Sequence, residues 1–223
     1  MKKAIVVLSG GLDSSTCAFI AKHDYDEVYA ITFNYGQKHT RELDSARAIG
    51  LEVGVKEHRF IQLPTPTIGS LTTAQAIPES RNVEEMSKEI PSTYVPARNT
   101  LFIAYALQFA EEVNADAIFV GVTAMDYSGY PDCRPEYIRA WQNLINEATK
   151  KTVTGGEIKL LTPLLNLYKA EIIDIGTELG VPYQLTWSCY NGGEKPCGKC
   201  DSCLLRLKGF LEIKKTDPLI YQE

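Results

Sequence analysis

Residues 9–16, with the sequence SGGLDSST, combine two adjacent glycines with hydroxyl and carboxylate side chains. They follow the apolar run Ala4–Leu8, typical of a buried strand, and precede the helical stretch Ser14–His23. A loop that opens a helix aims unpaired backbone N–H groups and the positive end of the helix dipole at one point. Glycine lets the backbone approach an anion closely. The sequence therefore predicts a phosphate-binding loop here, and the alternative is a tight strand–helix turn in which Ser14 is the N-cap.

The spacing of this loop excludes the two commonest nucleotide-binding motifs. It has neither the GxxxxGK[ST] pattern of a Walker A loop nor the GxGxxG pattern of dinucleotide-binding folds. Asp13 places a carboxylate beside the expected phosphates, which suits a hard cation such as Mg²⁺.

Four of the six cysteines are concentrated near the C-terminus, as Cys189, Cys197, Cys200 and Cys203. The C-x7-C-x2-C-x2-C spacing predicts a closed tetrahedral site for structural Zn²⁺. An iron–sulfur cluster is the main alternative, although ferredoxin-type runs usually add a Cys-Pro pair that is absent here. Unligated core cysteines are a third interpretation. Cys17 and Cys133 lie apart from the cluster, and Cys17 is expected to be a small buried hydrophobe.

The elements that position these residues alternate between strands and helices, which predicts a parallel sheet with helices on both faces. Strands are expected at Ala4–Leu8, Glu27–Phe33, Gly54–Phe60 and Asp116–Gly121, and helices at Ser14–His23, His39–Ile49, Asn99–Glu112, Pro135–Lys150 and Tyr168–Leu179. Residues 62–96 show no periodicity and are rich in Pro, Thr and Ser, which indicates a functional loop or lid, or else a flexible insertion.

Length and composition describe an ordinary globular protein. The chain has 223 residues and a formal net charge of −5, which argues against a broad nucleic-acid surface. The N-terminal apolar run is too short for a signal peptide or a membrane span. We expect a cytoplasmic protein with a nucleotide-binding domain at residues 1–185. The change of composition near Thr186 predicts a small metal-binding module at residues 186–223, packed on that domain.

The SGGxDS pattern of the loop resembles that of the PP-loop ATP pyrophosphatases. Further segments extend the similarity over nearly the whole chain: TFNYGQKH at 32–39, YVPARN at 94–99, GVTAMDYSGYPDCR at 121–134, TPLLNLYKAE at 162–171 and CYNGGEKPCGKCDSC at 189–203. Together they resemble the 7-cyano-7-deazaguanine synthase family of queuosine biosynthesis. Leu12 and Ala97 depart mildly from the family pattern, and residues 62–90 diverge most.

The resemblance implies an adenine nucleotide alpha hydrolase-like, Rossmann-like fold and a defined reaction. In that reaction 7-carboxy-7-deazaguanine, ATP and ammonia give the nitrile through an adenylated carboxylate and then an adenylated amide. It also implies Mg²⁺ as a cofactor and a homodimer, with no membrane and no direct nucleic-acid partner.

The site residues carried over fall into three groups. Leu8, Ser9, Gly10, Gly11, Leu12, Asp13, Ser14, Ser15 and Thr16 would hold ATP, with the adenine near Phe33. Asp13, Arg98 and Lys169 would be catalytic, because a guanidinium fork suits carboxylate or phosphate and an ammonium stabilises charge that develops during adenylyl transfer. Asp126, Tyr127, Tyr130, Asp132 and Arg134 would bind the deazaguanine by hydrogen bonding, stacking and charge.

Three other functions fit the sequence less well. A PP-loop enzyme that adenylates a base in tRNA directly needs an RNA-binding surface, which the acidic composition disfavours. A zinc-ribbon nucleic-acid-binding protein would not need an intact phosphate loop. An amidotransferase would need a glutaminase domain for which this chain has no room.

Overall fold

The computed structural model describes residues 1–38, 40–82, 85–86, 90–125 and 130–222. Within these residues a five-stranded, all-parallel sheet has the strand order β3-β2-β1-β4-β5. Its strands are β1 (Lys3–Val7), β2 (Glu27–Asn34), β3 (His58–Gln62), β4 (Ala117–Val120) and β5 (Lys159–Leu161). The prediction of a parallel α/β fold is confirmed.

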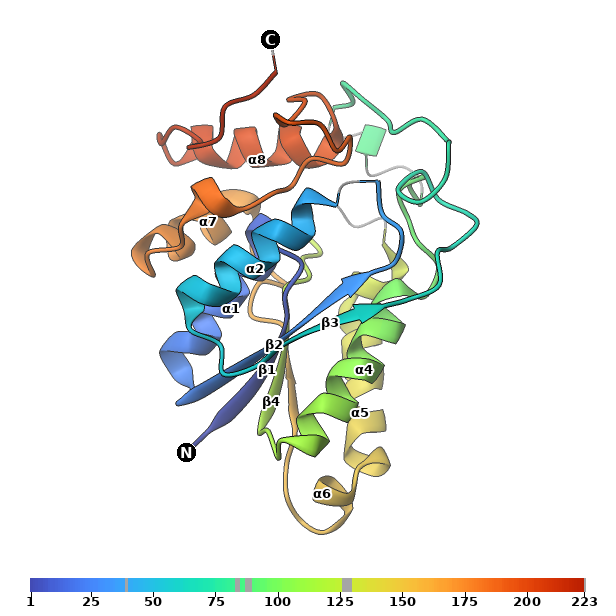
Figure 1. Ribbon diagram of the computed structural model, residues 1–223, viewed down its shortest axis with the longest axis vertical. Helices are drawn as coiled ribbons and strands as arrows, with labels where there is room; N and C mark the ends of the chain where they lie inside the picture. The colour runs from blue at the N-terminus through green and yellow to red at the C-terminus, as the bar shows by residue number, and fades with distance from the viewer. Residues whose placement is uncertain (39, 83–84, 87–89, 126–129, 223) are drawn as a thin grey trace.

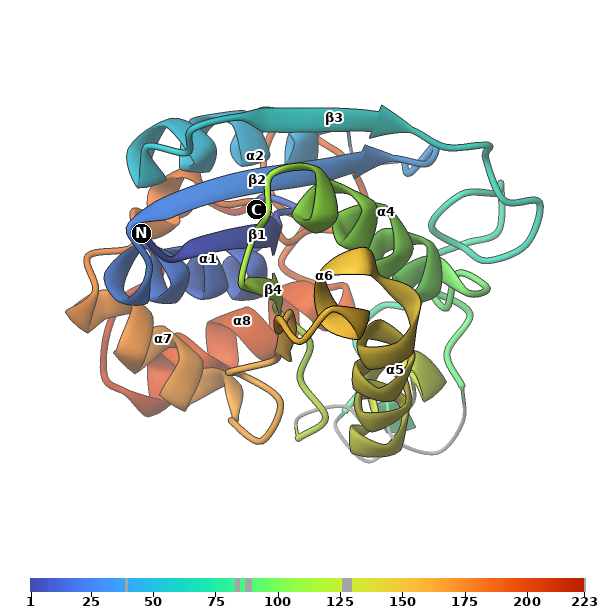
Figure 2. The ribbon, with the colours of Figure 1, turned by 90° about the horizontal axis from the view of Figure 1, so that it is seen from below.

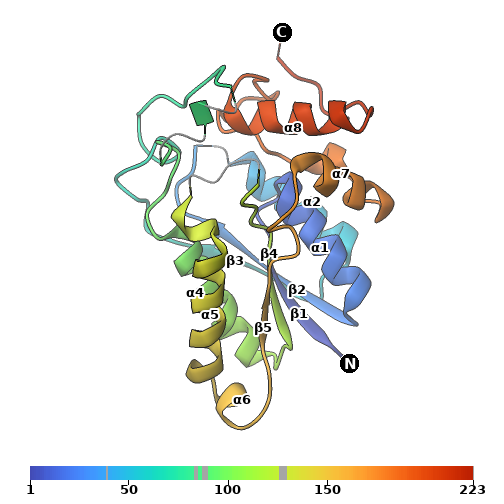
Figure 3. The ribbon, with the colours of Figure 1, turned by 180° about the vertical axis from the view of Figure 1, so that it is seen from behind.

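Helices cover both faces of the sheet. The described helices are α1 (Leu12–Asp24), α2 (Arg41–Val53), α4 (Arg98–Glu112), α5 (Pro135–Ala148), α6 (Lys150–Val153), α7 (Lys169–Glu178) and α8 (Asp201–Glu212), with 3₁₀ turns η1 (Pro131–Cys133) and η2 (Tyr183–Leu185). Figure 1 and the reverse view in Figure 3 show α1 and α2 on one side of the sheet and α4 and α5 on the other.

The central strand β1 shows why the sheet needs both layers. Ala4 and Val6 belong to the apolar cluster under α1 and α2, whereas Ile5 and Val7 belong to the cluster under α4 and α5. All four side chains are buried, as expected for a parallel strand with helices on both faces. Figure 2 shows β1 between β2 and β4, inside the sheet.

Helix α8 lies outside the two layers, alongside α7 (Figure 1). Its buried Arg206 donates to both carboxylate oxygens of Asp217, at 2.7 and 2.9 Å, and so holds the C-terminal tail against the helix. Arg206 also donates to Thr186 Oγ1 at 2.6 Å and to the carbonyl of Tyr183 at 3.0 Å. These contacts therefore join α8 to the chain that leads into residues 187–203, called the cysteine segment below.

Candidate functional site

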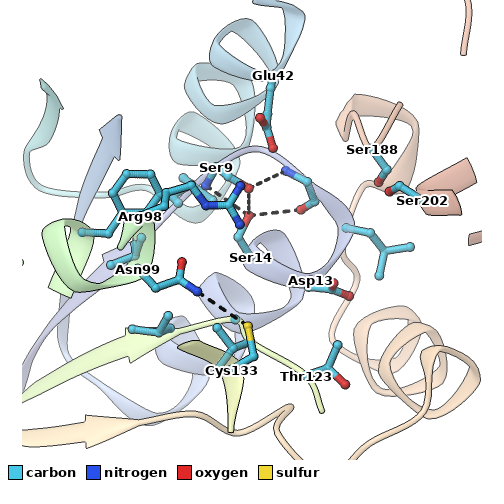
Figure 4. Close-up of a pocket in the computed structure, with 18 of the residues that line it drawn as sticks. Ser9, Asp13, Ser14, Glu42, Arg98, Asn99, Thr123, Cys133, Ser188 and Ser202 are labelled. Atoms are coloured by element: carbon cyan, nitrogen blue, oxygen red, sulfur yellow. Dashed lines mark hydrogen bonds between the residues drawn. The ribbon is translucent and has the colours of Figure 1, made fainter. Parts of the chain in front are cut away.

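A cavity of about 260 Å³ opens at the carboxyl ends of β1, β2 and β4 (Figure 4). Ligands bind at this edge in open α/β sheets because the loops that leave the strands converge there. The lining residues come from the glycine loop, α2, α4, α7 and the cysteine segment. Those used below are Ser9, Gly11, Asp13, Ser14, Phe33, Tyr35, Glu42, Leu71, Arg98, Asn99, Tyr130, Cys133, Lys169, Ser188, Tyr190 and Ser202.

The glycine loop joins β1 to α1 by a turn that requires glycine at position 10. Gly10 has a φ of +85°, and a Cβ there would lie 2.4 Å from both the carbonyl oxygen of Glu42 and the backbone nitrogen of Ala46. The loop is thus pressed against α2. Gly11 is the N-cap of α1, so the N-terminus of this helix faces the cavity.

Two serine hydroxyls of the loop lie together at the cavity wall. Ser9 Oγ and Ser14 Oγ are 3.0 Å apart, and the backbone N–H of Gly11 donates to Ser9 Oγ at 3.2 Å (Figure 4). Ser15 and Thr16 are placed differently, because both side chains are fully buried and neither lines the cavity. The Ser15 hydroxyl donates to the carbonyl of Gly11, and the Thr16 hydroxyl lies 2.8 Å from that of Tyr183.

Asp13 and Lys169 contact each other at the cavity wall opposite Arg98. The ammonium of Lys169 donates to both carboxylate oxygens of Asp13, at 2.6 and 2.8 Å. Lys169 is the first residue of α7, where the capping box of Tyr168 and Glu171 sets the start of the helix. Two residues expected to be catalytic are therefore brought into direct contact.

Arg98 is the first residue of α4 and reaches into the cavity between aromatic side chains. One guanidinium nitrogen donates to the Tyr35 hydroxyl at 3.3 Å, and the group lies 6.0 Å from the ring of Phe102. Its Nε is buried and has no hydrogen-bond partner among the described residues. Since a buried donor without a partner costs free energy, this atom suggests a ligand that would accept its hydrogen bond. Phe33 stacks on Phe102 beside it, with ring centroids 4.1 Å apart.

The residues predicted to bind the base are distributed unevenly. Tyr130 lines the cavity, with its hydroxyl 2.7 Å from that of Thr93. Asp132 is buried behind the wall and accepts from the backbone N–H of Asn99 at 3.3 Å, whereas Arg134 is exposed and donates to the carbonyl of Pro131. Asp126 and Tyr127 lie outside the described residues.

Sequence reasoning missed several polar side chains of the cavity, among them Glu42, Asn99 and Cys133. Burial raises the pKa of the Glu42 carboxyl to about 7, against the opposing effects of Arg98 and a hydrogen bond with Ser9. Burial likewise raises the pKa of the Cys133 thiol to about 12, so it is protonated at neutral pH. Asn99 donates to Cys133 Sγ at 3.6 Å. Glu42 belongs to no recognisable motif. Because a single glutamate in an amphipathic helix is typical of a solvent-exposed helix face, its sequence context does not indicate a functional site.

The four C-terminal cysteines form one buried cluster, and their Sγ atoms all lie within 4.8 Å of one another. Backbone N–H groups point at the sulfurs: Cys197 N–H donates to Cys189 Sγ, and Cys200 N–H donates to Cys197 Sγ, both at 3.3 Å. Such donors stabilise thiolates. Four sulfur ligands at these distances suit a tetrahedral metal ion with no open coordination position.

The cysteine segment also builds part of the cavity wall. Ser188 and Tyr190 flank Cys189, and Ser202 precedes Cys203; all three line the cavity. The backbone N–H of Trp187 donates to the carbonyl of Gly10 at 2.9 Å, so this segment contacts the glycine loop directly.

The irregular segment between β3 and α4 docks on the cysteine cluster. Glu79 forms an isolated antiparallel bridge with Cys200, and Arg81 binds the Asp201 carboxylate through two nitrogens. The same segment contributes Leu71 to the cavity. The described residues of this segment therefore contact both the cysteine cluster and the cavity.

No helix among the described residues is long and apolar enough to cross a membrane.

Comparison with known proteins gives one consistent result. The family model described as "Queuosine biosynthesis protein QueC" matches residues 3–214. The 7-cyano-7-deazaguanine synthase of Trichodesmium erythraeum is 53% identical over 221 residues, which cover 98% of this chain and 100% of the relative. That of Acetivibrio thermocellus is 49% identical over 224 residues, covering 100% of this chain and 99% of the relative.

Among solved structures, NMN synthetase from Francisella tularensis has a TM-score of 0.50 at 17% identity, over 96% of this chain and 78% of that one. At this identity the similarity concerns the fold alone.

Proposed function

The chain belongs to the QueC family of queuosine biosynthesis proteins, and on that premise we propose that it converts 7-carboxy-7-deazaguanine, ATP and ammonia into 7-cyano-7-deazaguanine. The observation that carries this proposal is the shared cavity of the glycine loop, the Asp13–Lys169 pair and Arg98. It places the N-terminus of α1, which suits a phosphate, together with an ammonium and a guanidinium on the walls of one cavity.

The chemistry requires activation because a carboxylate is anionic and has no good leaving group. Attack of its oxygen on the α-phosphorus of ATP releases pyrophosphate and gives an acyl adenylate, from which ammonia displaces AMP to form the amide. The amide oxygen is then adenylated by a second ATP, and its departure with AMP leaves the C≡N group. One nucleotide site can serve both halves.

We assign roles to the chain's residues as follows. The Gly11 N-cap, Ser9 and Ser14 hold the pyrophosphate portion of ATP, whereas Ser15 and Thr16 stiffen the first turn of α1 from within. Lys169 neutralises charge that develops at the α-phosphate. Arg98 pairs with the substrate carboxylate or the α-phosphate, which gives its buried Nε an acceptor.

Two metal ions complete the proposal. Mg²⁺ bound by Asp13 and the ATP phosphates would neutralise phosphate charge, because a carboxylate beside phosphates suits this cation. Zn²⁺ would be held by Cys189, Cys197, Cys200 and Cys203 and would fix the cysteine segment against the cavity. The four thiolates provide a donor set that fits Zn²⁺, whereas the Asp13 carboxylate would have to share its oxygens between Mg²⁺ and Lys169.

Further assignments rest on the family and on composition. We propose a synthase domain at residues 1–185 with a metal-binding module at 186–223, a cytoplasmic homodimer, and ammonia, taken from solution or delivered by a partner, as the nitrogen donor. Among the described residues, Tyr130 is the candidate for stacking on the deazaguanine.

The decisive experiment incubates the protein with 7-carboxy-7-deazaguanine, ATP, Mg²⁺ and ammonium, and follows base and nucleotide by mass spectrometry. The proposal expects the nitrile together with two AMP and two pyrophosphate per nitrile. Turnover of ATP with unmodified tRNA, and none with the deazaguanine, would replace it with the tRNA-adenylating alternative.

A further inference from the structure

Glu42 brings a carboxylate to the cavity directly over the glycine loop. It lies in the first turn of α2, and its Oε1 is 3.6 Å from the place that a Cβ on Gly11 would occupy. The close approach of Gly10 to the backbone of Glu42 and Ala46 fixes this turn of the helix. Figure 4 shows Glu42 on the α2 side of the loop, across the cavity from Asn99 and Cys133.

The surroundings of Glu42 favour a carboxyl group that exchanges protons near neutral pH. A hydrogen bond joins it to Ser9, and Arg98 is the cation that acts on it from α4. Tyr35 faces it from the end of β2. Arg41, on its own helix, is turned toward Trp187, with its guanidinium carbon 4.8 Å from the ring.

The other titratable groups of the described cavity lining are less suited to accept a proton. Asp13 is bound through both oxygens by Lys169. Burial raises the pKa of the Cys133 thiol to about 12 and raises the pKa of the Tyr130 hydroxyl above its ordinary value. This thiol and this hydroxyl are already protonated at neutral pH, so each can donate a proton but cannot accept one.

The reaction proposed above must remove three protons from nitrogen. When ammonia attacks the acyl adenylate, a C–N bond forms, one N–H proton leaves and the C–O bond to AMP breaks. After adenylation of the amide oxygen, two more N–H protons leave while the second C–O bond breaks with AMP. All three hydrogens of ammonia are therefore lost as protons, and each needs an acceptor in the cavity.

We propose that Glu42 is the proton acceptor for the N–H groups in both halves of the reaction. This inference rests on the proposed function and adds to it a residue for a step that the family name does not describe. The carboxylate takes the proton and passes it to water between steps, so it returns to the ionised form without a further reactant.

The test compares Glu42→Gln with Glu52→Gln, which makes the same change at an exposed position of the same helix. Adenylation of the carboxylate transfers no proton from nitrogen, so Glu42→Gln should keep substrate-dependent ATP–pyrophosphate exchange within about threefold of the wild type. Conversion of the purified amide to the nitrile should fall by about 100-fold or more, as expected for loss of a general base. Glu52→Gln should match the wild type in both assays.

The pH dependence separates proton transfer from positioning. With the amide as substrate, ionisation of ammonia does not enter. The wild-type rate should decline below a pH of about 7, where Glu42 becomes protonated, and the residual rate of Glu42→Gln should not show this decline. A variant that loses pyrophosphate exchange in equal measure, or that keeps the wild-type pH profile, would show that Glu42 only positions Arg98 or ATP and would overturn the inference. A wild-type protein that makes no nitrile would instead refute the proposed function.

Discussion

Lys169 donates to both carboxylate oxygens of Asp13, although 156 residues separate the two in the chain. The pair is largely shielded from solvent, with the Lys169 side chain 11% exposed and that of Asp13 29%. Such a contact orients the ammonium toward the cavity before any ligand binds. The two side chains therefore form a preorganised unit at the start of α1 and α7.

Lys169→Met should reduce nitrile formation by about 100-fold or more, because it removes a cation from the site of charge development. Substrate-dependent ATP–pyrophosphate exchange should fall equally, since the adenylation step itself is affected. Lys208→Met provides the control, because Lys208 pairs with Glu212 on the exposed side of α8. An exchange rate that survives in Lys169→Met would contradict a role in adenylyl transfer.

Gly10→Ala should destabilise the protein by more than about 2 kcal/mol, because the new Cβ would meet the α2 backbone at 2.4 Å. Gly54→Ala is the matched comparison, since Gly54 has a similar φ of +75° with nothing within 4 Å of an added Cβ. Its cost should be about 1 kcal/mol of backbone strain alone. Equilibrium denaturation of both variants measures the difference, and equal costs would show that the loop and α2 can move apart.

Cys200→Ser should remove the metal from the cysteine cluster and lower the free energy of unfolding by at least about 3 kcal/mol, since a metal that binds only the folded state stabilises it. Elemental analysis should find about one Zn²⁺ per wild-type chain. Cys17→Ala, a change at a cysteine outside the cluster, should keep the metal. Iron with acid-labile sulfide in the wild type would identify an iron–sulfur cluster instead.

Asp217→Asn should cost about 3 kcal/mol, because it leaves the buried Arg206 guanidinium without its anionic partner. Asp174→Asn removes a carboxylate that meets Lys215 at 3.5 Å on the surface and should cost less than about 1 kcal/mol. Urea titration of both variants tests whether this buried pair holds the C-terminal tail.

Acid should weaken the fold through His58 in a defined range. Thr32 donates its hydroxyl proton to the carbonyl of Leu8, so its contact with His58 at 2.8 Å requires the imidazole Nε2–H as donor. Burial, reinforced by Arg47, lowers the pKa of His58 from 6.5 to about 4. The unfolded chain therefore binds a proton first, and stability is lost as the pH falls from about 6.5 to 4. In His58→Gln, unfolding free energies measured across this range should vary less with pH.

The sequence predicted the strands whose own residues form a continuous apolar run. The apolar runs of β1, β2 and β4 are buried on both faces, and each lies within two residues of its expected bounds. The third strand was expected from Gly54 but begins at His58, because Gly54 is the left-handed C-cap of α2. Strand β5 has only three residues, too few to show a period.

Helix α8 was also missed. Its apolar positions follow directly on the CxxCxxC spacing, and a metal site was expected there rather than a regular element. Helix α8 is held by the contact between its Arg206 and Asp217 of the C-terminal tail. Because these residues belong to different segments, no local sequence pattern reveals the contact.

For the site, the residue types were predictable but their pairings were not. Asp13, Arg98 and Lys169 stand in recognisable motifs, whereas the contact between Asp13 and Lys169 depends on the placement of α7 beside α1. Glu42 becomes significant only because Gly10 allows α2 to approach the loop. Thr16 was expected to face the nucleotide and instead bonds to Tyr183 inside the protein.

Ser188, Tyr190 and Ser202 line the cavity and are sequence neighbours of cysteines in the cluster. An acyl adenylate can be attacked by water as well as by ammonia, so the yield of nitrile depends on how well this wall excludes solvent. A looser wall on this side would admit water to the activated substrate. The enzyme would then spend ATP and return the starting acid, since hydrolysis would undo each adenylation. The residues proposed to hold the metal and those proposed to exclude water thus lie in one stretch of the chain, residues 188–203.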